Sequence, residues 1–240
     1  MVSELAVIAL IVVASGLIQG ITGFGFGLFA MGALVLAVPV RDATVIVAIV
    51  TLGSALTNLG SVREHIDLRE AAPVVLPSIP ATIAGVLLIP YIPTATLKAG
   101  VAVMIIAGCA VTLFSPGDRI LTRPRPAADL AGLIGGLFGG ALNMGGPPVV
   151  LYTLLRGWDK TQSKAVMSVY FCATGVLRVA LHVATGAATW PLIRLSLLLL
   201  VPAVLASYLG VRVFRRLSTQ AFRYAATGLL IALAAKVLAG

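Results

Sequence analysis

The chain has 240 residues, of which 60% are hydrophobic and 10% are charged. A soluble domain carries about 25% charged residues, so this composition, with a mean hydropathy of +1.09, excludes a soluble globular protein. The net charge of +9 does not indicate a nucleic-acid partner, because the basic residues lie in loops between apolar runs, where they orient membrane spans. The sequence therefore predicts an all-α polytopic membrane protein.

Eight apolar segments follow one another along the chain, and polar, charged or proline-bearing stretches separate them. Six have the length of one bilayer crossing, which needs about 20 residues. The first and the fifth are longer. The 34 residues of the first would measure about 51 Å as continuous helix, against a hydrocarbon core of about 30 Å. The segments are 5–38, 43–60, 72–90, 97–115, 127–155, 165–185, 192–210 and 220–238.

The first long segment contains the sequence GITGFGFG, from Gly20 to Gly27. Glycine weakens a helix because it loses more backbone freedom on ordering than any other residue. The glycine-rich stretch therefore predicts that the helix stops here and that the chain turns within the membrane. Backbone that is not helical at that depth requires surrounding protein or a water-filled cavity. We expect a re-entrant hairpin over 5–38.

The second long segment has a matching break, GGALNMGGPP, at positions 139–148. Pro147 and Pro148 suit the first turn of a following helix, because proline lacks the N–H group that would have no partner there. We expect a second re-entrant hairpin over 127–155. An alternative function of glycine is to let helices pack closely when it recurs every three or four residues. This alternative fits Gly16, Gly20, Gly23, Gly132, Gly136 and Gly139.

The two halves of the chain resemble each other. Three stretches recur in the same order, at offsets of 116, 122 and 124, which keeps one register with small insertions and indicates a duplication. The matches are GLIQGI at 16–21 with GLIGGL at 132–137, PATIAGVLL at 80–88 with PAVLASYLG at 202–210, and TATLKAGVAVMIIAGCAV at 94–111 with STQAFRYAATGLLIALAA at 218–235.

Positive charge selects between two topologies. Eight simple crossings place seven Lys and Arg residues on one side and nine on the other, which predicts no orientation. Two hairpins place twelve on one side and only four on the other, as the positive-inside rule expects. The twelve then face the cytoplasm and both termini face outward. A hairpin plus three spans crosses an odd number of times, so the sequence predicts inverted repeats at 1–116 and 127–240, joined by a cytoplasmic linker at 117–126.

Each hairpin directs the N-terminus of a short helix toward the middle of the membrane, one near Gly27 and one near Pro147. A helix N-terminus presents free N–H donors and about half a positive charge, so two that converge predict an anion site. Polar and aromatic side chains in and beside the breaks complete it. The predicted substrate-binding residues are Gln19, Thr22, Gly23, Phe24, Gly25, Phe26, Asn143, Met144, Gly145, Gly146, Pro147 and Arg178.

Arg178 is the one basic residue well inside a predicted span. A charge there is costly and indicates function by default. The alternative is that its side chain extends to the outer membrane interface. The acidic residues all lie near the ends of spans or in loops, so none is placed for a proton relay or a sodium site. We therefore expect an anion pathway driven by membrane potential; the alternative is a proton-coupled transporter of another small anion, such as a carboxylate, or one that imports thiosulfate.

The sequence does not predict an enzyme, a metal site or a cofactor. His65 and His182 lie far apart and near opposite faces, and no metal-binding motif links them. Cys109 and Cys172 both fall inside apolar spans, where we expect them to pack as small apolar residues.

The motifs GLIQGITGFGFG near the N-terminus and GGLFGGALNMGGPPVVLY in the second half resemble the sulfite exporter TauE/SafE family of bacterial permeases. The resemblance covers essentially the whole chain. It implies export of sulfur-containing anions such as sulfite, sulfoacetate, thiosulfate or related sulfonates, a multi-pass protein of the bacterial inner membrane, and no cofactor. The expected partners are a small anionic substrate and the lipid bilayer, with a homodimer left open and nucleic acid excluded. The paired motifs cover Gly20 to Gly27 and Asn143 to Pro148, and they do not bear on Arg178.

Overall fold

The computed structural model describes residues 2–113, 121 and 124–216. All regular elements within these ranges are helices. The predicted last span, 220–238, and much of the predicted linker, 117–126, lie outside the described residues. The elements are α1 (Val2–Thr22), α2 (Phe26–Leu34), α3 (Val40–Ser61), η1 (Arg63–His65), α4 (Leu68–Leu88), η2 (Ile89–Tyr91), α5 (Thr94–Leu113), α6 (Pro124–Leu142), α7 (Gly146–Leu155), α8 (Lys160–Ala184) and α9 (Trp190–Arg216).

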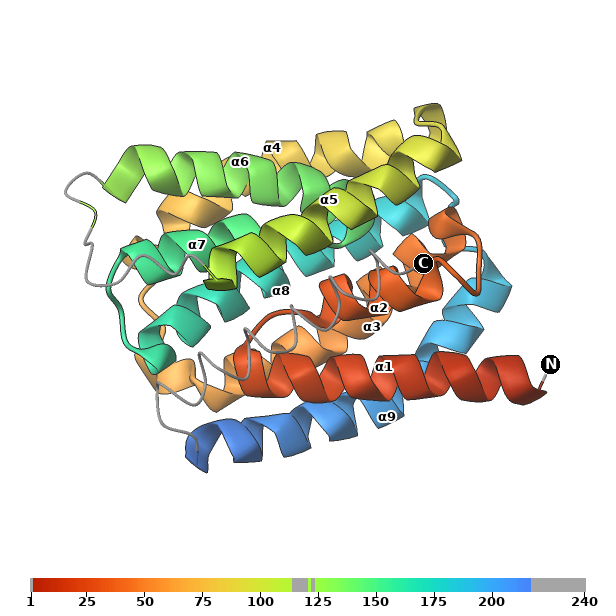
Figure 1. Cartoon of the computed structure of the whole chain (residues 1–240), viewed down its shortest axis with the longest axis horizontal. Coiled ribbons are helices and arrows are strands. Elements are labelled where there is room, and N and C mark those ends of the chain that lie inside the picture. Colours follow the sequence, from red (N-terminus) through yellow and green to blue (C-terminus); the bar gives the residue numbers. More distant parts are fainter. Residues whose placement is uncertain (1, 114–120, 122–123, 217–240) are drawn as a thin grey trace.

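Both long apolar segments are broken into two helices. α1 runs from the N-terminus across the molecule, and α2 returns toward the end at which α1 began (Figure 1). α6 and α7 form a second pair of this kind, which enters from the opposite end (Figure 1). The interruptions are short, because only residues 23–25 separate α1 from α2 and only residues 143–145 separate α6 from α7. The described chain thus contains two helical hairpins of opposite direction.

Five of the described helices are long and apolar enough to cross a bilayer: α1, α3, α4, α8 and α9. Four of them correspond to the predicted spans 43–60, 72–90, 165–185 and 192–210, and α5 corresponds to 97–115. The outer face of α9 carries leucine side chains that are at least 50% exposed. A large exposed apolar face suits contact with lipid rather than with water. The exposed leucines of α9 are Leu197, Leu198, Leu205 and Leu209.

Small residues bring two pairs of helices into backbone contact. Between α1 and α9, a Cβ on Gly20 would overlap the carbonyl oxygen of Ser207. Between α4 and α6, a Cβ on Gly136 would lie 2.5 Å from the carbonyl oxygen of Ser78. Close packing is therefore the role of the glycines on these two faces, as the packing alternative proposed. The glycines of these faces that the sequence singled out are Gly16, Gly20, Gly132 and Gly136, and Gly85, Gly140 and Gly210 make the same kind of contact.

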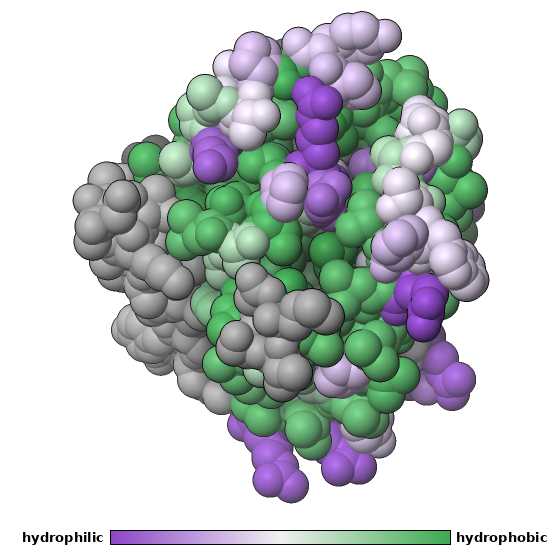
Figure 2. Space-filling view, turned by 90° about the vertical axis from the view of Figure 1, so that its right-hand side faces the viewer, coloured by the Kyte–Doolittle hydropathy of each residue, from purple (hydrophilic) through white to green (hydrophobic). Residues whose placement is uncertain are grey.

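Basic residues gather at the end of the molecule where α3 ends and α8 begins, which we call the basic end (Figure 1). The opposite end, where α1 begins, carries Arg41, Lys98 and Arg194 among the described residues. Figure 2 shows this opposite end, where apolar surface predominates and hydrophilic residues are scattered. The basic end carries Arg63, Arg69, Arg125, Arg156, Lys160, Arg212, Arg215 and Arg216.

Candidate functional site

The first break joins α1 to α2 through residues with left-handed backbone. Gly23 has a φ of 81° and Gly25 a φ of 95°, values that residues with a side chain rarely adopt. The Gly23 N–H donates to the carbonyl oxygen of Gln19 at 2.8 Å and closes the end of α1. The Thr22 hydroxyl accepts a hydrogen bond from the N–H of Phe24 at 3.3 Å. Gly23 therefore belongs to the break. The alternative that it serves close helix packing does not hold for this residue.

The second break closes its first helix in the same way, with asparagine in place of Gly23, but the counterpart of Gly25, Gly145, has a right-handed backbone with a φ of −74°. Asn143 has a φ of 57°, a conformation that asparagine tolerates better than most residues. Its N–H donates to the carbonyl oxygen of Gly139 at 2.9 Å and closes α6. Its side-chain Nδ2 donates to the carbonyl oxygen of Thr44 in α3, at 2.8 Å. α7 then begins at Gly146, with Pro147 in the first turn.

The two breaks touch each other. A Cβ on Gly27, in the first turn of α2, would overlap the carbonyl oxygen of Asn143. Gly146, at the start of α7, lies against Phe24, because a Cβ there would be 3.7 Å from the phenyl ring. The starts of the two short helices therefore lie side by side, and position 27 requires glycine because the hairpins meet backbone to backbone.

A small cavity lies at this meeting point. Its volume is about 10 Å³, roughly the space of one water molecule, so this conformation has no room for an anion of several atoms. Four residues outside the predicted substrate-binding set also take part in its wall: Gly27, Leu28, Thr51 and Phe171. The predicted residues that line it are Gln19, Gly25, Phe26, Asn143, Met144 and Gly146.

Two buried oxygen atoms of the cavity-lining residues have no hydrogen-bond partner among the described residues. They are the hydroxyl oxygen of Thr51 and the side-chain oxygen of Asn143. An unsatisfied buried polar group costs about 1–3 kcal/mol, which a bound water or polar ligand would recover. Thr51 comes from α3, and the sequence has no signal for it, because a threonine in an apolar helix ordinarily bonds to its own backbone.

The other predicted residues of the two breaks lie beside the cavity but do not line it. Thr22, Gly23 and Phe24 do so in the first break, and Gly145 and Pro147 in the second. Gly145 packs so closely that a Cβ there would overlap both the carbonyl oxygen of Gly135 and the hydroxyl of Tyr170.

Arg178 lies behind the second break and does not line the cavity. Its side chain is only 1% exposed, so the alternative in which it extends to the outer interface is wrong. Its Nη1 donates to the carbonyl oxygen of Gly139 at 3.3 Å, and its Nε and Nη2 have no partner within the part of the chain that the structure describes. A Cβ on Gly139 would lie 3.4 Å from both Arg178 Nη1 and the Tyr170 hydroxyl. Gly139 therefore leaves room for these side chains and is not part of the helix-packing face.

Lys164 occupies a comparable place behind the first break. Lys164 is one of the twelve basic residues predicted on the cytoplasmic side, and the predicted span 165–185 left it in the preceding loop. The loop placement is wrong, because Lys164 lies within α8 and is 0% exposed. Its Nζ donates to the carbonyl oxygen of Gly20 at 2.6 Å and lies 3.9 Å from the centre of the Phe214 ring. In the sequence, Lys164 stands at the boundary between a polar and an apolar stretch. This position does not indicate in which direction its side chain points.

At each break one carbonyl oxygen accepts two hydrogen bonds. One comes from the N–H of the break itself, and the other comes from a side chain of the long helix that follows the hairpin. In the first hairpin this side chain is Asn58 of α3, whose Nδ2 donates to the backbone carbonyl oxygen of Gln19 at 3.1 Å. In the second it is Arg178 of α8. The corresponding residues, each pair 120 positions apart, are Gln19 and Gly139, Gly23 and Asn143, and Asn58 and Arg178. The predicted match of 16–21 with 132–137, at an offset of 116, is therefore wrong by four residues, about one helical turn.

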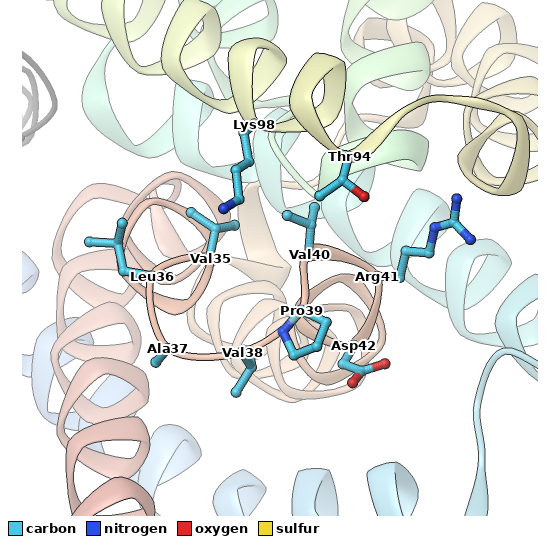
Figure 3. Close-up of a pocket in the computed structure, with 10 residues that line it drawn as sticks. All are labelled: Val35, Leu36, Ala37, Val38, Pro39, Val40, Arg41, Asp42, Thr94 and Lys98. Carbon is cyan, nitrogen blue, oxygen red and sulfur yellow. The ribbon is translucent and has the colours of Figure 1, made fainter.

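A larger depression of about 610 Å³ lies at the other end of α2. Figure 3 shows its wall, formed by the connection from Val35 to Pro39, by the first residues of α3 up to Asp42, and by Thr94 and Lys98 of α5. Arg41 points away from Lys98 in this view, and its Nη2 donates to the carbonyl oxygen of Pro90 at 3.1 Å. Because its two cations do not converge, this depression is a weaker candidate than the small cavity between the breaks.

Comparison with known proteins places this architecture in a family. A family model described as sulfite exporter TauE/SafE matches residues 8–237. A protein of Cupriavidus necator named "Probable sulfite/organosulfonate exporter TauE" is 26% identical over 231 residues, which cover 92% of this chain and 88% of that protein. No solved structure gives a significant match. The chain belongs to the sulfite exporter TauE/SafE family.

Proposed function

We propose that the protein exports small sulfur-containing anions, namely sulfite, sulfoacetate or related organosulfonates, and that it holds them where the two breaks meet. Membership of the TauE/SafE family and the name of the Cupriavidus necator relative support the substrate class. The observation that carries the proposal is the contact between Gly27 and Asn143, which puts the starts of α2 and α7 at one buried cavity.

The donors for the anion come mainly from α2. The first N–H groups of a helix have no partner within the helix, and Phe26, Gly27 and Leu28 of this first turn all line the cavity. α7 offers fewer donors, because Pro147 and the proline that follows it have no N–H group. The Thr51 hydroxyl adds a donor that has no partner in residues 2–113, 121 and 124–216.

The transport cycle that we propose depends on inverted repeats at 1–116 and 127–240, with 117–126 between them. The opposite directions of the two hairpins and the pairs of residues 120 positions apart support this duplication. With one hairpin entering from each side, a site between their breaks can open alternately to either side of the membrane. The closed cavity of about 10 Å³ then corresponds to an occluded form.

The driving force in this proposal is the membrane potential. None of the Asp or Glu residues whose side chains the structure describes is buried, so these residues offer no carboxylate for a proton relay or a sodium site. An inside-negative potential drives an anion outward by about 2.3 kcal/mol per charge per 100 mV. Export therefore needs no coupled ion.

The function is tested with purified protein in liposomes that are loaded with one anion at a time. We expect efflux of sulfite and sulfoacetate when a potassium diffusion potential is imposed, without any proton or sodium gradient. If efflux at zero membrane potential required an imposed proton gradient, transport would be proton-coupled and not driven by the potential. Faster efflux of lactate than of either sulfur compound would instead show that the substrates are carboxylates.

The topology is tested by cysteine accessibility in a background that lacks Cys109 and Cys172. Single cysteines at Arg41 and Arg194 are expected to react with a membrane-impermeant thiol reagent from outside the cell, and cysteines at Arg63 and Arg216 only after permeabilisation. All four side chains are exposed at the ends of the described helices. Labelling of positions 41 and 216 from the same side would support eight simple crossings instead.

A further inference from the structure

Each break presents two helix ends of opposite charge. The start of α2 carries about half a positive charge, but the end of α1, which lies beside it, carries about half a negative charge. The same holds for α7 and α6. Two opposite ends at one place largely cancel, so the helix N-termini alone do not make the cavity attractive to an anion.

The structure places one buried cation on each of the two helix C-termini. Lys164 Nζ donates to the carbonyl oxygen of Gly20, in the last turn of α1. Arg178 Nη1 donates to the carbonyl oxygen of Gly139, in the last turn of α6. A cation is most stabilising at a helix C-terminus, where it meets the carbonyl groups that have no partner within the helix. Both cations come from one helix, α8.

No buried acid balances these two charges within the part of the chain whose side chains the structure describes. The aspartates and glutamates there are exposed or half-buried. Glu70, for example, forms a salt bridge with Arg156 at 2.8 Å, and its side chain remains 37% exposed. Two cations that are buried without an acidic partner are costly, and a mobile anion in the neighbouring cavity would offset that cost.

We propose that Lys164 and Arg178 are positioning residues that make the cavity select for negative charge. Each one neutralises the negative end of a broken helix, which leaves the positive ends of α2 and α7 to act on the substrate. The inference rests on the proposed function, because it assigns the origin of anion selectivity at that same site. It also explains why Arg178 is buried behind the cavity and does not line it.

The proposal predicts that affinity depends on the charge of the substrate and not only on its shape. The interaction of a substrate with a fixed charge is proportional to the charge of the substrate. At a separation of about 10 Å and an effective dielectric constant of about 20, one fixed charge changes affinity about tenfold for a monoanion and about a hundredfold for a dianion. A residue that only maintains packing would affect both substrates by the same factor.

The experiment measures the affinity of two ligands of matched shape, sulfoacetate as the dianion and its amide, sulfoacetamide, as the monoanion. Lys164→Gln and Arg178→Gln are each expected to weaken sulfoacetate binding about ten times more than sulfoacetamide binding. Lys164→Arg and Arg178→Lys retain the charge. In these variants the ratio of the sulfoacetate affinity to the sulfoacetamide affinity is expected to equal that of the wild-type protein. Asn58→Ala is the matched neutral control, because Asn58 caps the first hairpin without a charge and its loss should weaken both ligands equally.

The wild-type protein keeps the inference falsifiable if the glutamine variants do not fold. It should bind sulfoacetate at least about tenfold more tightly than sulfoacetamide, and equal affinities would overturn the inference. Equal weakening of the two ligands by folded Lys164→Gln and Arg178→Gln would also overturn it while leaving the proposed function intact. Failure of the wild-type protein to bind or transport any of the sulfur anions would overturn the proposed function itself.

Discussion

Replacing Gly27 by alanine should reduce anion transport by about a hundredfold or more, because displacing a binding site by about 1 Å has effects of this size. The added Cβ would overlap the carbonyl oxygen of Asn143. The position of the Cβ is fixed by the backbone and its partner is a backbone atom, so no side-chain rotation can relieve the contact and one hairpin must move away from the other. We expect the protein to insert into the membrane, since the substitution leaves the apolar spans unchanged. Flux in liposomes, normalised to inserted protein, measures the effect.

Gly60→Ala is the matched control for this variant. Gly60 also lies in a helix, near the end of α3, but a Cβ there would have no neighbour within 4 Å. Its flux should equal that of the wild-type protein. Gly146→Ala should be intermediate, since the nearest atom to its Cβ is 3.6 Å away, an ordinary contact. Near-normal flux in Gly27→Ala would show that transport does not require the two breaks to meet.

Replacing Asn143 by aspartate should weaken sulfoacetate binding by about a hundredfold or more, because a fixed negative charge within a few ångströms repels the substrate. Aspartate has nearly the same shape as asparagine and also tolerates left-handed backbone, so the break keeps its geometry. The Asn143 side-chain oxygen is buried and accepts no hydrogen bond from the residues that the structure describes. A titration of the purified variant with sulfoacetate measures the loss.

Asn143→Gly separates the charge from the hydrogen bond. It retains the backbone conformation but, like the aspartate variant, loses the Nδ2 hydrogen bond to the Thr44 carbonyl oxygen. The loss of one hydrogen bond predicts a weakening of only about tenfold. If the glycine and aspartate variants bound sulfoacetate equally well, the substrate would not approach Asn143, and the position of the proposed site would be wrong.

The positions of both breaks could be predicted from the sequence because they depend on short-range backbone chemistry. The glycines at positions 23 and 25 permit left-handed backbone, and Pro147 favours the start of a helix, whatever the rest of the chain does. α2 and α7 accordingly start at Phe26 and Gly146, next to the predicted Gly27 and Pro147. The asymmetry of positive charge likewise predicted which loops share one end of the molecule.

The roles of individual buried residues depended on contacts between distant parts of the chain. The local sequence predicted Lys164 as a loop residue and Arg178 as a substrate ligand. Both instead cap the broken helices, because helix packing turns their side chains toward α1 and α6. Likewise, no local pattern indicates that Thr51 and Phe171 share a cavity wall.

The amino-acid sequence by itself determined where the helices break and which loops lie together, because glycine, proline and charge act on their immediate surroundings. Only the tertiary structure decided that Gly27 meets Asn143 and that the cavity between the breaks is closed. The physical reason is that burial and contact depend on the rotation and the approach of whole helices. The packing of all their neighbours sets these two quantities, and no single stretch of sequence encodes them.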